Sequence, residues 1–182
     1  VTGQPISPSG KVMHKTVTLA PQEWKRALGP GDEVLQIHIP SGEPVKPELI
    51  RASKNEAVAF FKQYFPATSP KAFVCTSWTF SDLLESMLPE SSNLVQWLRE
   101  LYLFPLPSPA HSGLSFIFPE DEFDPETASR DTTLERAILD HLAADKPWRI
   151  GGMFMLLEDL KHYGSQHYRS QWRLSDFSEV RN

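Results

Sequence analysis

The sequence has 182 residues, of which 40% are hydrophobic and 23% are charged, and its formal net charge is −5. This composition is ordinary for a globular protein with one core, and the acidic balance argues against a nucleic-acid partner. One cysteine excludes an intramolecular disulfide and leaves the redox compartment open, so a cytoplasmic protein is the default expectation. No apolar run approaches the roughly 20 residues that span a bilayer, so we expect no membrane partner.

The first ten residues contain mainly turn-forming residue types. Residues 1–10 carry Pro, Ser and Gly, which predicts a flexible lead-in before a single domain over residues 11–182. The sequence opens at Val1 without a methionine, which indicates a fragment or a processed product and leaves room for an upstream domain. Alternating side chains from Lys11 to Leu19 predict a half-exposed strand.

The stretch from Val34 to Trp78 predicts one strand–helix–strand unit. Its parts are a strand over Val34–Ile39, a helix over Pro47–Tyr64 with an apolar stripe, and a strand over Phe73–Trp78. A helix of that length between two strands makes a right-handed crossover with parallel strands. The loop that enters the helix is a usual place for a ligand in such units.

The rest of the chain continues to alternate between helical and extended patterns. A capping box at Thr132 and Glu135 predicts the start of one helix, and Gly151-Gly152 predicts a bulge or a close backbone approach within a strand. The pattern indicates an α/β fold. The further predicted elements are helices over Leu83–Leu88, from Asn93 and after Thr132, and strands over Leu114–Phe118, Trp148–Leu157 and His167–Leu174.

Several well-known catalytic motifs are missing. The sequence has no dinucleotide-binding or Walker glycine pattern, no H-E-x-x-H and no G-x-S-x-G, which argues against a dinucleotide enzyme, an NTPase, a zinc protease and a serine hydrolase. One Cys cannot build a thiolate zinc site, and the six His show no characteristic ligand spacing. We therefore predict no metal site.

His38 lies within the first apolar strand, and Gln36 points to the same side of it. One interpretation is a buried histidine hydrogen-bonded to neighbouring backbone. The other is a polar patch where a substrate or an acyl thioester lies against the sheet, with His38 as base or orienting group.

Cys75 and Ser77 alternate on one face of the second strand. A cysteine at such a position is typically a small core residue, because a nucleophile would need a neighbouring base and a lowered thiol pKa. Asn93 lies between two predicted helices, where it is explained either as a helix cap or as a side chain facing a cleft.

Five short stretches resemble one family, the GNAT-like C-terminal domain of bacterial acyltransferase-domain proteins. The resemblance covers about Trp24 to Phe154 and implies a GNAT-like mixed central sheet with helices on both faces, preceded in the family by a smaller N-terminal domain. The stretches are Val34–Pro40, Phe60-Phe61 with Phe65-Pro66, Cys75–Trp78, Leu88-Pro89 with Ser92-Asn93, and Asp131–Ala137.

The resemblance also implies a chemistry. Acetyl-CoA or another acyl-CoA would lie between two splayed parallel strands, with its pyrophosphate at the following helix start, and an amine of a small molecule or peptide would attack the thioester. The residues implied for the cosubstrate are Gln36, Ile37, Gly42 and Lys46, and those implied for the catalytic cleft are His38, Ser77 and Asn93.

The loop Ser41–Lys46 departs from the phosphate loop of the wider superfamily. It offers one glycine, Gly42, and the prolines around it lack the N–H groups that a phosphate needs. The alternative hypothesis is therefore a catalytically inactive GNAT-like domain that binds a small ligand or a protein partner. An open slot between the two strands favours the enzyme, whereas a gap filled by His38 and Trp78 favours the alternative.

Overall fold

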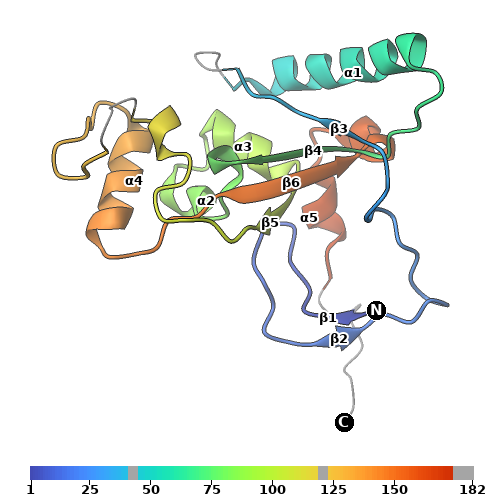
Figure 1. Ribbon diagram of the computed structural model, residues 1–182, viewed down its shortest axis with the longest axis horizontal. Helices are drawn as coiled ribbons and strands as arrows, with labels where there is room; N and C mark the ends of the chain where they lie inside the picture. The colour runs from blue at the N-terminus through green and yellow to red at the C-terminus, as the bar shows by residue number, and fades with distance from the viewer. Residues whose placement is uncertain (41–44, 119–122, 174–182) are drawn as a thin grey trace.

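The computed structural model describes residues 1–40, 45–118 and 123–173 (Figure 1). At its centre lies a four-stranded sheet in the order β3-β4-β6-β5. β3 runs parallel to β4, whereas β6 is antiparallel to both of its neighbours. The sheet is therefore mixed, as expected. Its strands are β3 (Val34–Gln36), β4 (Ala72–Ser77), β5 (Tyr102–Pro105) and β6 (Gly151–Leu156).

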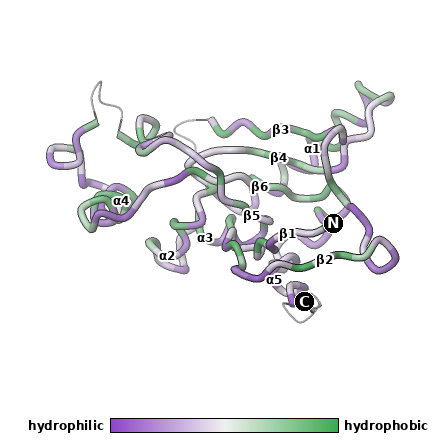
Figure 2. The backbone as a smooth tube through the Cα atoms, turned by 60° about the horizontal axis from the view of Figure 1, so that its bottom comes forward, coloured by the Kyte–Doolittle hydropathy of each residue, from purple (hydrophilic) through white to green (hydrophobic). Residues whose placement is uncertain are grey.

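The predicted strand–helix–strand unit is confirmed. Helix α1 spans Pro47–Tyr64, with proline at its first position, where no N–H is required, and Glu48 in the first turn, where the helix dipole favours an anion. Gln36 of β3 lies opposite Val74 of β4 in the parallel register. Figure 2 shows hydrophobic and hydrophilic residues alternating along β3 and the segment after it, as expected of a strand with one covered face.

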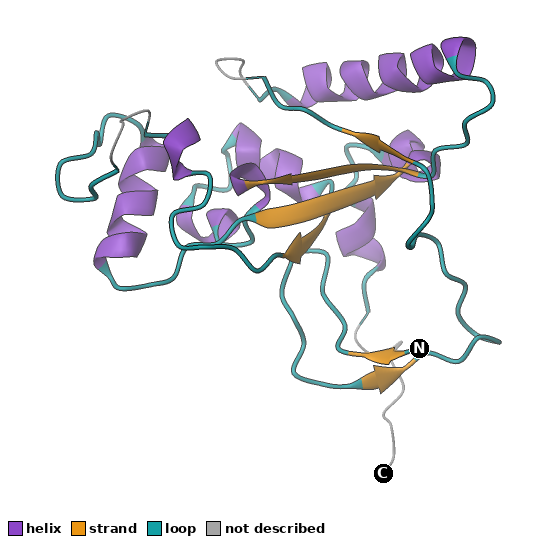
Figure 3. Cartoon of the chain, in the orientation of Figure 1, coloured by secondary structure: helices purple, strands orange, loops and turns teal. Residues whose placement is uncertain are grey.

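Helices cover both faces of the sheet (Figure 3). On one face, α1 contacts α3 and η3 over buried residues that include Phe73 and Met155. On the other face, Tyr168 of α5 packs against Tyr102 and Phe154. The α/β fold class is therefore confirmed. The helices besides α1 are α2 (Leu84–Met87), α3 (Asn93–Arg99), α4 (Thr133–Ala143) and α5 (His167–Gln171), with 3-10 turns η1 (Trp78–Phe80), η2 (Leu114–Phe116) and η3 (Leu157–His162).

The start of α4 and the glycine pair of β6 have the expected local structure. Thr132 accepts a hydrogen bond from the Glu135 N–H (3.1 Å), and the Glu135 carboxylate accepts one from the Thr132 N–H (2.7 Å). The register of β6 against β4 is continuous, so there is no bulge. A Cβ atom at Gly151 would overlap the Phe80 carbonyl oxygen, and one at Gly152 would overlap the Phe104 ring. The glycines therefore permit a close backbone approach.

The N-terminal segment pairs with itself and lies along β5. β1 (Thr2–Gly3) and β2 (Val17–Thr18) form a two-stranded antiparallel sheet, so only the end of the predicted strand over 11–19 forms. The Tyr102 hydroxyl donates to the Ile6 carbonyl (2.5 Å), and the Leu103 N–H donates to the Pro8 carbonyl (3.0 Å). None of the described helices combines the length and apolar character that crossing a bilayer requires.

The predicted strand over Leu114–Phe118 is wrong, because this segment forms η2 and a turn. Gly113 adopts a left-handed conformation (φ 76°) that turns the chain into the 3-10 helix. Leu114 and Phe118 are buried, whereas Phe116 is 79% exposed. A spacing of four between buried side chains belongs to a helical turn and not to a strand.

The predicted strand from His167 is also wrong, since His167–Gln171 form α5; Leu174 lies outside the described residues. The Tyr168 hydroxyl accepts a hydrogen bond from the Leu156 N–H (2.8 Å), which fixes this helix to the end of β6. Strand β5 was not predicted. It is four residues long and follows α3 after two residues, so its apolar pattern merges with that of the helix.

Candidate functional site

β3 and β4 separate after three pairs of residues. Their last hydrogen bond runs from the Ile37 N–H to the Val74 carbonyl (2.9 Å). β4 continues to Ser77 but pairs there only with β6. The next rung of a parallel ladder would join the Thr76 N–H to the Ile37 carbonyl, and it is not formed among the described residues. The two strands are therefore splayed.

A cavity of about 710 Å³ lies in this opening, and we call it the strand gap. Its volume is within the roughly 300–1,000 Å³ of small-molecule sites. Trp78 lines the wall without filling the space. The gap is thus open and not closed by His38 and Trp78. Its lining comprises the extended segment Gln36–Pro40, the end of β4 and η1 (Cys75–Thr79), and Val45, Leu94, Ser112, Gly113, Phe116, Leu134 and Ile150.

Four of the predicted site residues meet at the strand gap. Gln36, Ile37 and His38 lie on the segment that leaves β3, and Ser77 lies at the end of β4 across the gap. His38 is exposed, which rules out the interpretation as a buried histidine. The Ser77 hydroxyl accepts a hydrogen bond from the Thr79 N–H (3.2 Å), so it also caps η1.

The remaining predicted site residues lie elsewhere. Asn93 is exposed at the first position of α3 and lines neither of the two cavities beside β3. The N-cap of α3 is Ser92, without a side-chain hydrogen bond. Lys46 is exposed and is the N-cap residue of α1, whereas Gly42 lies outside the described residues. Their roles stay predictions.

The backbone of Thr76 was not anticipated as part of the site. Successive N–H groups of a strand point to opposite edges, and the Val74 carbonyl already faces β3. The Thr76 N–H therefore faces the strand gap, where no described strand residue accepts its hydrogen bond. A backbone donor is independent of residue type, so no sequence pattern could have indicated it.

Cys75 is buried in the core and its thiol is not activated. Burial raises the pKa of this thiol, an effect that the hydrogen bond to the Thr76 carbonyl (3.9 Å) only partly offsets. A raised pKa keeps the group protonated at neutral pH, and the thiol is then a poor nucleophile. These observations favour a small core residue over a catalytic cysteine.

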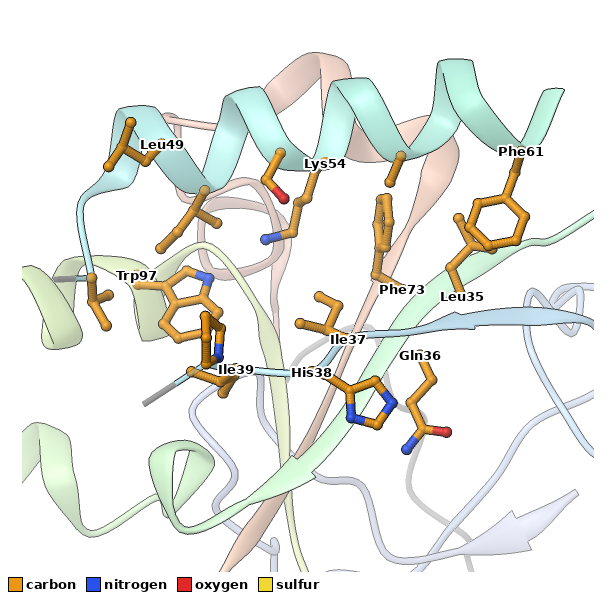
Figure 4. Close-up of a pocket in the computed structure, with 15 residues that line it drawn as sticks. Leu35, Gln36, Ile37, His38, Ile39, Leu49, Lys54, Phe61, Phe73 and Trp97 are labelled. Atoms are coloured by element: carbon orange, nitrogen blue, oxygen red, sulfur yellow. The ribbon is translucent and has the colours of Figure 1, made fainter. Parts of the chain in front are cut away.

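A second cavity, of about 400 Å³, lies between α1 and the segment that follows β3 (Figure 4). We call it the helix pocket. Leu35, Ile37 and Phe73 form part of its apolar wall. Lys54 points from α1 toward Trp97 and is only 4% exposed, and this burial lowers the pKa of its amine to about 8. The segment Gln36–Pro40 lines both cavities and separates them.

Three potential metal ligands gather where η3 is followed by the start of α5. Asp159, His162 and His167 each offer one ligand atom, and these atoms lie within 4.8 Å of one another. The two imidazole rings stack 4.5 Å apart, and His167 lies 3.5 Å from the Asp159 carboxylate. None of the three lines the strand gap or the helix pocket.

Comparison with solved structures gives matches at moderate sequence identity. An acyltransferase in complex with CoA and 10C-teicoplanin matches with 27% identity and a TM-score of 0.61, over 68% of this chain and 41% of that chain. A mutant acyltransferase in complex with octanoyl-CoA matches with 26% identity and a TM-score of 0.65, over 78% and 44%. An acyltransferase in complex with decanoyl-CoA and teicoplanin matches with 27% identity and a TM-score of 0.64, over 78% and 44%.

This chain therefore spans less than half the length of these solved acyltransferases. No curated protein matches the sequence significantly. The family model described as the GNAT-like C-terminal domain matches residues 9–155, which is most of the chain. This match agrees with the mixed sheet, the parallel β3–β4 pair and its splay. The chain is a member of the GNAT-like C-terminal domain family.

Proposed function

We propose that this domain binds an acyl-CoA in the strand gap and transfers the acyl group to an amine. The observation that carries the proposal is the splay of β3 and β4 around a cavity of about 710 Å³. It is supported by the solved relatives, whose complexes contain CoA, octanoyl-CoA and decanoyl-CoA. In this proposal acetyl-CoA or a longer acyl-CoA is the cosubstrate.

The cosubstrate would contact the segment that links β3 to α1. Gln36 and Ile37 line the gap and would face the pantetheine arm. Lys46 stands at the N-terminus of α1, an end whose dipole favours anions, and with Gly42 it would meet the pyrophosphate. Pro47 supplies no N–H there, so the side chain of Lys46 would carry more of the contact.

The reaction would be an acyl transfer in which the amine loses one proton and the CoA thiolate gains one. The amine nitrogen attacks the thioester carbonyl carbon, a C–N bond forms, the C–S bond breaks, and the CoA thiolate takes up a proton. His38 would accept the proton from the amine. The Thr76 N–H would donate a hydrogen bond to the carbonyl oxygen as negative charge develops on it. Ser77 would orient the acceptor in the gap.

The acceptor would be a small-molecule amine or a peptide. Two of the solved relatives are complexes with teicoplanin or 10C-teicoplanin. Because those chains are more than twice as long as the part matched here, we include in the proposal a companion N-terminal domain that helps to form the acceptor site.

Binding is tested first. CoA, acetyl-CoA and octanoyl-CoA at millimolar concentration should raise the melting temperature, because a ligand that binds only the folded state at 100 times its Kd stabilises it by about 2.7 kcal/mol. No shift with any of the three would overturn the proposal.

Catalysis is tested with His38→Ala, measured as release of free CoA thiol in the presence of amine acceptors. Loss of a general base should lower the rate by roughly 10²- to 10⁴-fold while octanoyl-CoA binding is retained. His14→Ala is the matched control, since His14 is also exposed but lines neither cavity. Acyl-CoA binding without turnover by the unmodified protein would instead support the catalytically inactive domain.

A further inference from the structure

The helix pocket contains one buried charge in a mostly apolar wall. Lys54 is the only buried polar side chain among the residues that line it. The other polar residues of the lining are Gln36 and His38, whose side chains point away from α1 in Figure 4, and Ser53, which is exposed. A buried ammonium is costly unless an acceptor or a counter-charge accompanies it. No carboxylate of the described residues pairs with Lys54.

Two aromatic residues surround the Lys54 ammonium. Its Nζ atom lies 5.5 Å from the centre of the Trp97 ring and 5.4 Å from that of Tyr163. Cation–π contacts of this kind balance part of the charge. A ring face nevertheless accepts hydrogen bonds poorly, and no oxygen of the described residues accepts a hydrogen bond from this ammonium.

The same two residues carry further polar atoms without partners. The Trp97 Nε1–H and the Tyr163 hydroxyl are buried and form no hydrogen bond among the described residues. Of these two residues Trp97 lines the helix pocket together with Lys54, whereas Tyr163 lies behind the ammonium and lines a neighbouring cavity. Unsatisfied buried donors are rare in folded proteins and call for an explanation. An anionic acceptor in the helix pocket would satisfy the Lys54 ammonium, beside which the Trp97 ring lies.

The shape of the pocket indicates what would carry that anion. Leu49 and Ile39 are exposed and lie at the rim, whereas Lys54, Trp97 and Phe73 are buried. A ligand would therefore pass apolar walls with one end next to the ammonium. We propose that the helix pocket binds a carboxylate carried by an apolar chain, with Lys54 as its anion-binding residue. The carboxylate is either that of a free fatty acid or the far end of an acyl donor, and only this second source rests on the proposed function.

Isothermal titration of the 182-residue chain with octanoate and with 1-octanol tests the carboxylate. The unmodified protein should bind octanoate more tightly than octanol. Lys54→Met should bind octanoate roughly 10- to 100-fold more weakly, because a hydrogen bond to a charged group usually contributes that much to affinity. Its affinity for octanol should not change. Lys62→Met, an exposed lysine of the same helix, is the matched control and should behave like the unmodified protein.

Equal affinities of the unmodified protein for octanoate and octanol would overturn the proposal, and that comparison stands even if the Lys54 variant does not fold. An octanoate preference that survives in Lys54→Met would also overturn it.

Octanoyl-CoA and octanedioyl-CoA then separate the two sources. Tighter, Lys54-dependent binding of octanedioyl-CoA assigns the carboxylate to the acyl donor, whereas an effect with octanoate alone assigns it to a free acid. If neither thioester binds but octanoate does, the proposed function fails and the carboxylate site stands. If octanoyl-CoA binds and no carboxylate is preferred, the carboxylate site fails and the proposed function stands.

Discussion

Lys54 places a charge where the fold alone would favour an apolar side chain. Its burial lowers the pKa to about 8 from an ordinary 10.5. Between these two pH values the unfolded chain binds more protons than the folded chain, so the free energy of unfolding rises with pH. Below pH 8 both states are protonated, and the full penalty of the buried charge is present.

Lys54→Met should therefore be more stable than the unmodified protein at pH 7, by on the order of 3 kcal/mol, since one pKa unit corresponds to about 1.36 kcal/mol. The difference should shrink as the pH rises from 8 toward 10.5. Urea unfolding at several pH values measures it, with Lys62→Met as a control that stays close to the unmodified protein. A variant that is less stable at pH 7 would mean that the aromatic contacts outweigh desolvation.

Gly151 and Gly152 are adjacent in β6 but should respond differently to substitution. A methyl group at Gly151 meets the backbone of Phe80, which cannot move without shifting η1. A methyl group at Gly152 meets the Phe104 ring, which can rotate away. Gly151→Ala should lower the free energy of unfolding by about 3 kcal/mol, at the upper end of overpacking, and Gly152→Ala by about 1 kcal/mol.

Chemical denaturation of both glycine variants measures this difference. Gly3→Ala is the control, because a Cβ atom there contacts nothing within 4 Å. Equal destabilisation by the two β6 substitutions would contradict the assignment of a rigid obstacle at one position and a movable one at the other.

At the scale of elements, Glu85 joins three helices. Its carboxylate on α2 accepts hydrogen bonds from Arg99 of α3 (3.0 Å) and from Arg169 of α5 (2.8 and 2.7 Å). Burial raises the pKa of this carboxyl, but the hydrogen bonds from Arg169 and Arg99 outweigh that effect and the pKa is lowered. The stabilisation is therefore present above the ordinary pKa near 4.5 and is lost as the pH falls through the lowered value.

Glu85→Gln should lower the free energy of unfolding at pH 7 by about 2 kcal/mol, because it leaves two arginines without their shared partner. Glu90→Gln is the matched control. Glu90 also binds Arg99 (3.0 Å) but its side chain is 84% exposed, so its removal should change stability by less than about 1 kcal/mol. Urea unfolding measures both variants. Similar losses of unfolding free energy in Glu85→Gln and Glu90→Gln would contradict the stronger contribution of Glu85.

Elements with strong local signals could be predicted from the sequence. Helix α1 has a proline start and a long apolar stripe, and α4 has a complete capping box, so both were found at their observed starts. α5 could not be found in this way. Its helical form depends on Tyr168 packing against the sheet and on Arg169 reaching Glu85, a residue 84 positions earlier. Such long-range contacts leave no local pattern.

At the scale of the whole molecule, the splay of the sheet should be visible in hydrogen exchange. The N–H of Cys75 lies in the ladder with β6, whereas that of Thr76 faces the strand gap. In the free protein the Thr76 amide should therefore exchange much faster than the Cys75 amide. Binding of octanoyl-CoA in the strand gap should slow the exchange of the Thr76 amide. Equal protection of the two amides in the free protein, measured by NMR, would contradict an open gap.

The candidate site was only partly accessible to sequence reasoning. Residues that lie on the strand–helix–strand unit, such as His38 and Ser77, could be placed opposite each other because that unit is local in sequence. The cluster of Lys54, Trp97 and Tyr163 could not, since its members come from three elements separated by other strands. Only the packed molecule brings the ammonium against the two aromatic rings.

The segment Gln36–Pro40 is the shared wall of the strand gap and the helix pocket. It has left the β ladder after Ile37, so few backbone hydrogen bonds oppose its displacement. A ligand that pushes this wall while filling one cavity changes the space available in the other. The two binding free energies are then coupled, and thermodynamic reciprocity requires each ligand to change the affinity of the other by the same factor.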